Sequence, residues 1–394
     1  MSQEDVAAMI ASLRAGNPTM WLRSSVSHDL PDVIQPGEVD AATARFKRFE
    51  PALRAVFAHA EWDGRIRSDL LDFPALAGAP PLLVKGDHAL PLTGSIKARG
   101  GIHELFCRIE TVAHAAGLLG DGDYAALAGE RARAIFARQT VTVASTGNLG
   151  FSIGLVARAF GLAAEVHMSH DAKAWKKDRL RLLGAHVVEH RADYSQAVAM
   201  ARAAAAGKPD VYFVDDENSR DLLVGYATAA DEVAGQLAAR GIVPTPDEPL
   251  VVYLPCGVGG APGGITYGLK RLYGAAVVAV FVEPVASACM LAALLTPDAP
   301  RRRSTSAARR RGRSPGPRSR SRPRSRSARR GSGRRSPTPA RRGAGARQGD
   351  GGGRIGGAAF LGFGHGCGGA GDRRGGRLAR YGNARLGPPR MGGD

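Results

Sequence analysis

Short apolar segments alternate with longer amphipathic segments through the middle of this 394-residue chain. The short apolar runs predict buried strands, and the longer segments, with apolar residues three or four positions apart, predict helices. Such alternation is typical of α/β proteins with parallel sheets and helices on both faces. The predicted strands are Leu82–Lys85, Val141–Ser145, Ala164–Met168, His186–Glu189, Val211–Val214, Leu250–Leu254 and Ala276–Val282, and the predicted helices are Ser95–Ile109, Gly147–Phe160, Ala172–Leu183, Tyr194–Ala206 and Ser219–Arg240.

The first 80 residues show a different pattern, with amphipathic helical stretches at Val6–Leu13 and Ala41–Phe57 and proline-containing turns between them. From these patterns we predict two lobes, each with a largely parallel twisted sheet flanked by helices. Residues 1–100 are assigned to an N-terminal helical segment and the start of a large lobe, 101–207 to a small lobe, 208–295 to the rest of the large lobe, and 296–394 to a low-complexity tail.

Charge separates the tail from the body. The whole chain has a formal net charge of +18, but residues 301–394 alone hold 26 Arg and three Asp with no Lys or Glu, a net charge of +23. The first 300 residues therefore carry −5 and lack the basic surface of a nucleic-acid-binding protein. Arg301–Arg342 consists almost entirely of Arg, Ser, Pro, Ala and Gly, so it cannot bury enough apolar surface to fold, and we predict disorder there.

Cysteine usage and the N-terminus bear on the compartment. Cys107, Cys256, Cys289 and Cys367 lie far apart and lack metal-ligand spacing, which favours a reducing compartment over a disulfide framework. The acidic N-terminus does not fit a signal peptide, and no apolar run is long enough to cross a bilayer. The sequence thus predicts a cytoplasmic protein without a membrane partner, and no metal site is assigned.

One lysine stands in a setting suited to chemistry. The strand Leu82–Lys85 leads into a turn around Pro91–Gly94, Ser95 is the predicted helix N-cap, and Lys97 follows in the first turn of the helix. The positive end of a helix dipole favours a neutral amine, and a neutral amine can condense with an aldehyde. Gly100 and Gly101 permit another segment to approach the helix closely. Lys97 is therefore a candidate covalent anchor.

The next strand is followed by a turn that suits a carboxylate. Ser145, Thr146, Gly147 and Asn148 join the strand Val141–Ser145 to a helix. Backbone amides at a helix start, together with two hydroxyl groups, form an anion site. A simple N-capping turn is the alternative.

A glycine-rich turn follows the strand Leu250–Leu254. Gly257, Val258, Gly259, Gly260 and Ala261 precede a helix, and consecutive glycines allow backbone N–H groups to converge on a phosphate. A Walker loop would end in Gly-Lys-Ser/Thr, and a dinucleotide fingerprint starting at Gly257 would need glycine where Pro262 stands. A lysine amine, a carboxylate turn and a phosphate turn are together what a pyridoxal-phosphate enzyme acting on amino acids requires.

These three stretches, in this order, resemble the fold-type-II pyridoxal-phosphate enzymes, the group that contains the serine and threonine dehydratases. Within it, four longer motifs are similar to those of the bacterial D-serine dehydratase family, the D-serine ammonia-lyases. The resemblance covers roughly residues 15–295, and its motifs are 94–101, 167–177, 214–222 and 254–260.

The resemblance implies a role for each motif. Lys97 would hold pyridoxal 5'-phosphate covalently and exchange the proton of the substrate Cα. Asn148 would contact the ring oxygen of the cofactor, and the turn Ser145–Asn148 would take the substrate carboxylate. Gly257–Ala261 would enclose the phosphate, with Ala261 where the family often has glycine. The implied reaction is α,β-elimination of D-serine to pyruvate and ammonia.

Several alternatives stay open at this point. Asp215, Asp216 and Glu217 could position substrate or a monovalent cation, since related dehydratases often use one, or could form a solvated loop. Residue chemistry does not show handedness, so another fold-type-II enzyme, an L-serine or threonine dehydratase or a racemase, is the alternative function. Nucleic-acid binding through the tail is a further alternative.

The resemblance stops near Leu295, where the family continues with further strands and helices. We interpret residues 296–394 as the product of a shifted reading frame in a G+C-rich gene, because such a frame yields Arg, Ala, Gly, Pro and Ser without Lys or Glu. The rival interpretation is an Arg/Ser arm, exemplified by 318–327, that binds RNA in a salt-sensitive way. No aromatic residues interleave there for base stacking, so we expect only non-specific nucleic-acid binding.

Overall fold

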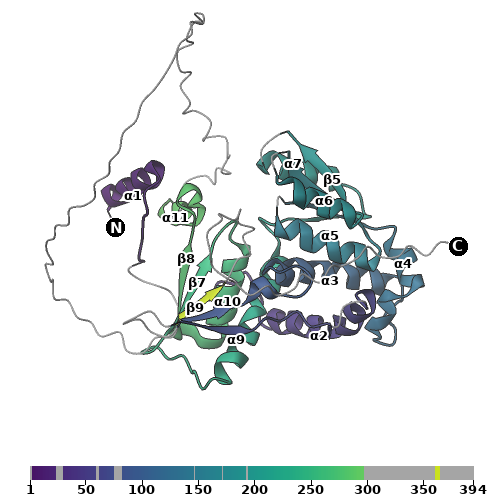
Figure 1. Ribbon diagram of the computed structural model, residues 1–394, viewed down its shortest axis with the longest axis horizontal. Helices are drawn as coiled ribbons and strands as arrows, with labels where there is room; N and C mark the ends of the chain where they lie inside the picture. The colour runs from purple at the N-terminus through teal and green to yellow at the C-terminus, as the bar shows by residue number, and fades with distance from the viewer. Residues whose placement is uncertain are drawn as a thin grey trace, which may run out of the picture. The chain divides into compact units, whose positions relative to one another are not determined.

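The computed structural model describes residues 2–23, 30–58, 62–74, 82–145, 147–170, 172–191, 194–296 and 360–363 (Figure 1). Two sheets organise the described part of the chain. The first has the strand order β1-β2-β9-β7-β8 and the second the order β5-β4-β3-β6.

The first sheet is parallel except at one edge, where β1 pairs antiparallel with β2. Its strands are β1 (Leu70–Phe73), β2 (Leu82–Lys85), β7 (Leu250–Pro255), β8 (Val277–Val282) and β9 (Phe360–Phe363). The predicted strands of this lobe are confirmed at β2, β7 and β8. The strand β9 was not predicted; it joins β2 to β7, with Phe360 in register with Leu82 and Val251. The rest of the predicted disordered tail lies outside the described residues.

The second sheet is parallel throughout and confirms all four of its predicted strands. They are β3 (Thr140–Ala144), β4 (Ala163–Ser169), β5 (His186–His190) and β6 (Val211–Val214). Parallel neighbours require crossover connections, and α5, α6 and α7 supply them in chain order. Val141, Val143 and Val166 are fully buried because helices cover both faces of the sheet.

The described helices follow the predicted pattern with one division. They are α1 (Gln3–Ala15), α2 (Glu38–Val56), α3 (Lys97–Ala115), α4 (Glu130–Phe136), α5 (Asn148–Phe160), α6 (Ala174–Leu182), α7 (Tyr194–Ala205), α8 (Arg220–Ala227), α9 (Ala229–Ala238), α10 (Gly260–Tyr273) and α11 (Cys289–Leu295). The single helix predicted over Ser219–Arg240 is two, α8 and α9, divided at Thr228. None of the described helices is long and apolar enough to cross a membrane.

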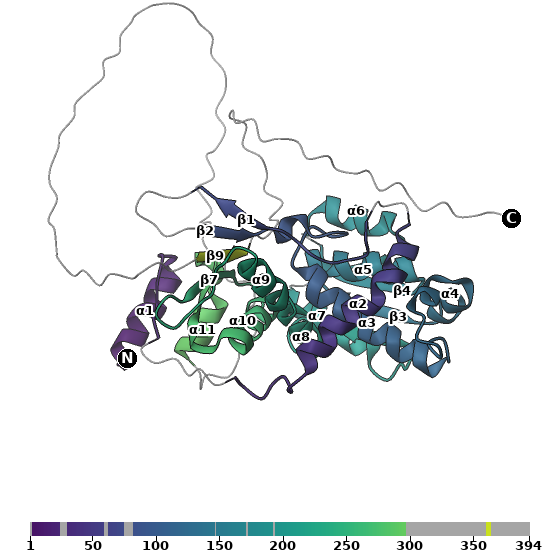
Figure 2. The same ribbon diagram turned by 90° about the horizontal axis from the view of Figure 1, so that it is seen from below.

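Helix α3 is central to the packing of the described chain. It contacts α2, α5 and α8, and α2, α3 and α8 lie side by side in Figure 2. Its buried face repeats every three or four residues at Ile102, Leu105, Phe106 and Ile109, all fully enclosed. Phe106 stacks on Phe49 of α2 with a centroid separation of 3.8 Å. The residue at the start of α3, Lys97, is therefore held on a rigid element.

Glycines let α8 pack closely between α3 and α10. A Cβ on Gly100 of α3 would lie 2.4 Å from Cζ of Tyr226 on α8, and a Cβ on Gly264 of α10 would lie 2.4 Å from the carbonyl oxygen of Leu223. Real Cβ atoms do not approach other heavy atoms so closely, so these positions admit only glycine without a shift of the helices.

The mutation Gly100→Ala should therefore destabilise the protein by about 1–3 kcal/mol, because the added methyl group overpacks against the Tyr226 ring. Gly235→Ala on α9 is the matched control, since its Cβ would meet nothing within 4 Å, and it should stabilise by about 0.5–1 kcal/mol. Urea denaturation of both variants measures the two effects. Equal stability of Gly100→Ala and the unmodified chain would contradict this packing.

Candidate active site

Lys97 lies in the first turn of α3, as predicted, and is the first residue of that helix, but the cap of the helix differs from the prediction. Ile96, not Ser95, occupies the N-cap position, and it makes no side-chain capping bond. The prediction of Ser95 as N-cap is therefore wrong by one residue. The buried Ser95 Oγ instead accepts hydrogen bonds from the Lys97 N–H (3.3 Å) and from the Asn148 side-chain amide (3.2 Å). Ser95 thus links the lysine helix to the predicted carboxylate turn.

The turn before Lys97 has strained backbone. Leu92 has a φ of 69°, a left-handed conformation that a branched side chain rarely adopts, and Gly94 has a φ of 60°. Such conformations persist only where surrounding structure holds them, and they gather at functional sites.

The predicted carboxylate turn joins β3 to α5. Ser145 is buried; its Oγ accepts a hydrogen bond from the Gly147 N–H at 3.2 Å, and its own N–H donates to the His167 carbonyl at 3.0 Å. Gly147 is the N-cap of α5 and Asn148 its first residue. Thr146 lies outside the described residues. Because Asn148 reaches Ser95, the structure brings this turn beside Lys97, as the sequence predicted.

The glycine-rich turn joins β7 to α10. Gly259 has a φ of 120°, which only glycine adopts readily, and α10 begins at Gly260. A Cβ on Gly257 would meet nothing within 4 Å, so there is open space on that side of the residue, whereas its carbonyl oxygen accepts a hydrogen bond from the Cys289 thiol. Val258 is exposed, whereas Ala261 is buried within the first turn of α10.

Two residues of other elements complete the site. The Lys97 Nζ lies 3.9 Å from Oδ1 of Asp216 and 5.2 Å from the ring centroid of Tyr226. A Cβ on Gly260 would lie 3.6 Å from Tyr226 Cε2 and 3.9 Å from the Asp216 carbonyl oxygen, so the same two residues also border the glycine-rich turn. They bring Lys97 and that turn together.

The polar atoms of these two residues are unusual. Asp216 Oδ1 and the Tyr226 hydroxyl are both buried without a hydrogen-bond partner among the described residues. Burial raises the pKa of the Tyr226 hydroxyl well above its usual value, and the neighbouring Asp216 carboxylate raises it further. Tyr226 was missed by sequence reasoning because no pattern near it in the sequence indicates it; the glycines at 100, 260 and 264 that lie close to it in the fold are distant from it along the chain.

The acidic triplet after β6 divides between two roles. Asp216 faces Lys97, whereas Asp215 pairs with Arg202 at 2.6 Å and accepts a hydrogen bond from the Glu217 N–H. Partial burial alone would raise the pKa of Asp215, but hydrogen bonds led by that from Arg202 lower it. Ser219 caps α8. Asp215 and Ser219 therefore have structural partners, and Asp216 alone of these residues approaches the lysine.

The arrangement fits pyridoxal phosphate by its own geometry. Ser95 links Lys97 to the anion-suited turn at Asn148, and Tyr226 lies close to both the Lys97 amine and the glycine-rich turn at Gly260. Asp216 Oδ1, which has no hydrogen-bond partner among the described residues, lies 3.9 Å from that amine. The sequence profile described as pyridoxal-phosphate dependent enzyme matches residues 62–329. The protein belongs to this family. Its cofactor is pyridoxal phosphate.

Several relatives that are similar to this chain share one name. A protein of Rhizobium leguminosarum bv. trifolii named probable D-serine dehydratase is 47% identical over 298 residues, covering 72% of this chain and 67% of the relative. A protein of Burkholderia pseudomallei with the same name is 50% identical over 298 residues, covering 73% and 67%. The chain therefore spans about two thirds of the length of these relatives.

Solved structures confirm the fold class. Holo diaminopropionate ammonia lyase of Escherichia coli matches with a TM-score of 0.55 at 19% identity, covering 69% of this chain and 66% of that chain. The apo form of the same enzyme matches with a TM-score of 0.53 at 20% identity, covering 68% and 70%. At this identity the likeness concerns the fold alone.

Proposed function

We propose that this chain is a D-serine ammonia-lyase, which converts D-serine to pyruvate and ammonia by α,β-elimination. The observation that supports the proposal is the position of the Lys97 amine beside Asp216 and Tyr226, which border the glycine-rich turn, and its link through Ser95 to Asn148. The names of the relatives that are 46–50% identical supply the substrate.

Pyridoxal phosphate, when bound, supplies the carbonyl group that captures an amine and the ring that accepts the electron pair of Cα. Lys97 would hold it covalently, and Asn148, already oriented by Ser95, would contact its ring oxygen. The phosphate would be bound by backbone N–H groups at the start of α10, in the turn formed by Gly257, Val258, Gly259, Gly260 and Ala261. The turn Ser145, Thr146, Gly147 and Asn148 would receive the substrate carboxylate.

The Lys97 amine would accept the proton from Cα of the substrate. Accepting the Cα proton gives Nζ a positive charge. Asp216 Oδ1 at 3.9 Å and the face of the Tyr226 ring at 5.2 Å would both stabilise that charge. The loss of the β-hydroxyl as water yields aminoacrylate, which water then hydrolyses to pyruvate and ammonia. Asp216 and Tyr226 are therefore proposed to hold the lysine proton between these steps.

The stereochemistry of the substrate provides the first test. Pyruvate release from D-serine should exceed release from L-serine by at least about tenfold in kcat/KM, which corresponds to about 1.4 kcal/mol of selective transition-state binding. A coupled pyruvate assay on the full chain loaded with pyridoxal phosphate measures both rates. Faster turnover of L-serine or threonine would favour the alternative dehydratase, and interconversion of the two serine isomers without pyruvate would favour a racemase.

A requirement for a monovalent cation stays a prediction.

A further inference from the structure

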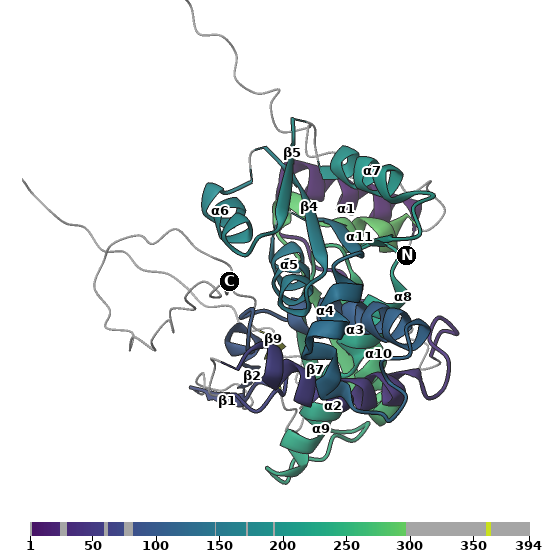
Figure 3. The ribbon, with the colours of Figure 1, turned by 90° about the vertical axis from the view of Figure 1, so that its right-hand side faces the viewer.

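Helices α5 and α6 are neighbours beside β4 and β5 (Figure 3), and their N-termini lie at the same end. Three pairs of positions fix this alignment. A Cβ on Gly154 would lie 2.9 Å from Leu180, and a Cβ on Gly184, just after α6, would lie 3.3 Å from Arg158 near the end of α5. At the opposite end, a Cβ on Gly147 would lie 3.5 Å from the Nζ of Lys176.

Lys176 is therefore directed to the carboxylate turn by helix geometry. It lies four residues before Leu180, so the two side chains share one face of α6, the face that packs on α5. The Lys176 side chain is half-buried, and its Nζ lies 5.5 Å from the ring centroid of Trp175. Its ammonium group thus lies beside Gly147, the N-cap of α5.

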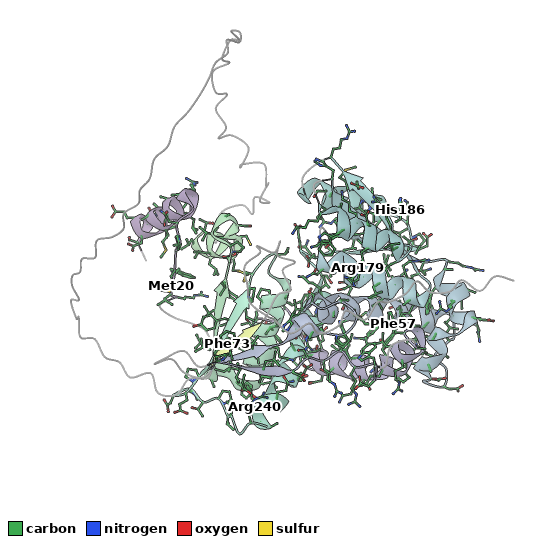
Figure 4. The ribbon with its side chains drawn as sticks, in the orientation of Figure 1. Met20, Phe57, Phe73, Arg179, His186 and Arg240 are labelled. Atoms are coloured by element: carbon green, nitrogen blue, oxygen red, sulfur yellow. The ribbon has the colours of Figure 1, made fainter. Side chains whose placement is uncertain are left out.

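A second cation of α6 lies one turn further along the same contact. Arg179, labelled in Figure 4, places its guanidinium carbon 4.1 Å from the ring centroid of Phe151 in the first turn of α5. Burial lowers the pKa of Arg179, and no charged group opposes that effect. Among the described residues neither Arg179 nor Lys176 makes an ion pair, whereas their neighbours Lys177 and Arg181 both pair with Glu189 at 2.6 Å.

The start of α5 also lacks an acidic residue in its first turn. A helix N-terminus carries partial positive charge, and here two cations without carboxylate partners among the described residues lie against it. Positive charge gathered in this way at a half-buried turn favours an anion. The helix start, the aligned Lys176 and the unpaired Arg179 therefore point to the same negatively charged group.

We propose that Lys176 is a substrate-specificity residue, whose ammonium group donates a hydrogen bond to the carboxylate of the amino-acid substrate at the turn Ser145–Asn148. Arg179 adds positive potential without contacting the substrate. The inference rests on the proposed function, since it assigns the turn to an amino acid. The substrate carboxylate keeps its charge through the elimination, so this contact stabilises the ground state and the transition state equally. Its loss should therefore weaken substrate binding without slowing the chemical step.

Lys176→Met tests the inference in the full chain loaded with pyridoxal phosphate. KM for D-serine should rise roughly 10- to 100-fold, the range expected for a lost charge-assisted hydrogen bond, while kcat stays within about threefold. Lys176→Arg should recover most of the affinity because it keeps the charge and the donor. Lys173→Met, which removes an exposed lysine from the start of the same helix, is the matched control and should leave KM unchanged.

Binding without elimination separates this role from a purely structural one. D-alanine has the carboxylate but no leaving group, and D-alaninol has a hydroxymethyl group in place of the carboxylate; both can be titrated by the change in cofactor absorbance. Lys176→Met should weaken the binding of D-alanine by the same 10- to 100-fold and leave the affinity for D-alaninol unchanged. Equal weakening of both amines, or of neither, would overturn the inference. Should the unmodified chain bind L-alanine better than D-alanine, the proposed D-serine activity fails, and the L-alanine and L-alaninol pair then tests Lys176 in the same way.

Discussion

Replacing Lys97 with alanine is expected to abolish both the absorbance of lysine-bound pyridoxal phosphate and nearly all elimination. The amine of Lys97 is proposed to anchor the cofactor and to exchange the Cα proton, and alanine can do neither. Loss of a positioned acid–base group alone costs on the order of 10²–10⁴ in rate. Because two roles fall on one amine, the decrease in kcat should lie at or beyond the upper end of that range. Absorbance spectra and pyruvate assays measure the two losses.

The fold of the Lys97→Ala variant should be retained, because the Lys97 side chain is 22% exposed and, among the described residues, its ion pair is with Asp216 at 3.9 Å. Far-UV circular dichroism and urea denaturation would show this. Lys208→Ala, at an exposed lysine after α7, is the control and should change neither spectrum nor rate. Covalent cofactor binding and undiminished pyruvate release by Lys97→Ala would remove the basis of the proposed function.

Strands were predictable where burial leaves a local signal. The run at 141–145 is apolar because both faces of its sheet are covered, whereas in the run at 250–254 buried residues alternate with less buried ones. Both strands appear within one residue of the predicted bounds. The edge strand β1 has one buried residue, Leu70, followed by three exposed ones, so it leaves no apolar run. The four residues of β9 stand among glycines, and their pairing with β2 and β7 joins segments that are distant in the sequence.

The site divides in the same way between local and tertiary signals. Lys97 and the two anion-suited turns were predictable because their chemistry depends on residue type next to a strand end or helix start. Local rules predicted Ser95 as a helix cap, but its hydroxyl oxygen accepts a hydrogen bond from the side chain of Asn148, 53 residues away. Tyr226 enters the site through the packing of α8 between α3 and α10, and no pattern near it in the sequence indicates a partner for Lys97.

A buried ion cluster supports the helix that carries Lys97. Arg99 of α3 is 3% exposed and donates hydrogen bonds to Glu232 of α9 at 2.9 Å and to Asp87 at 3.3 Å. Lys85 of β2, completely buried, also pairs with Glu232 and donates to Ser68. Two cations and two carboxylates therefore lie together, three of them buried and Glu232 20% exposed, and each depends on the others for compensation.

Arg99→Ala should lower the free energy of unfolding by about 3–5 kcal/mol at pH 7, because it leaves Asp87 and Glu232 with Lys85 as their remaining cation in a buried setting. Urea denaturation measures the loss. Arg131→Ala, at an exposed arginine of α4, should change stability by no more than about 0.5 kcal/mol. If the free energy of unfolding fell by less than about 1 kcal/mol in Arg99→Ala, water would be able to replace the interactions of Arg99 with the two carboxylates. That result would contradict the interpretation that the buried cluster needs Arg99.

The pH dependence of stability provides a second measure of the same cluster. Burial alone would raise the pKa of Glu232, but Arg99 and Lys85 outweigh it and lower the pKa to about 2. The unfolded chain should protonate this carboxylate near its ordinary value of about 4.3. The folded pKa is the lower one, so the stabilisation is complete above about pH 5 and is lost as the pH falls toward 2. In Arg99→Ala the strongest favourable charge is gone, so stability should fall less steeply over that interval than in the unmodified chain. An unchanged slope between pH 5 and pH 3 would mean that Glu232 owes its low pKa to Lys85 rather than to Arg99.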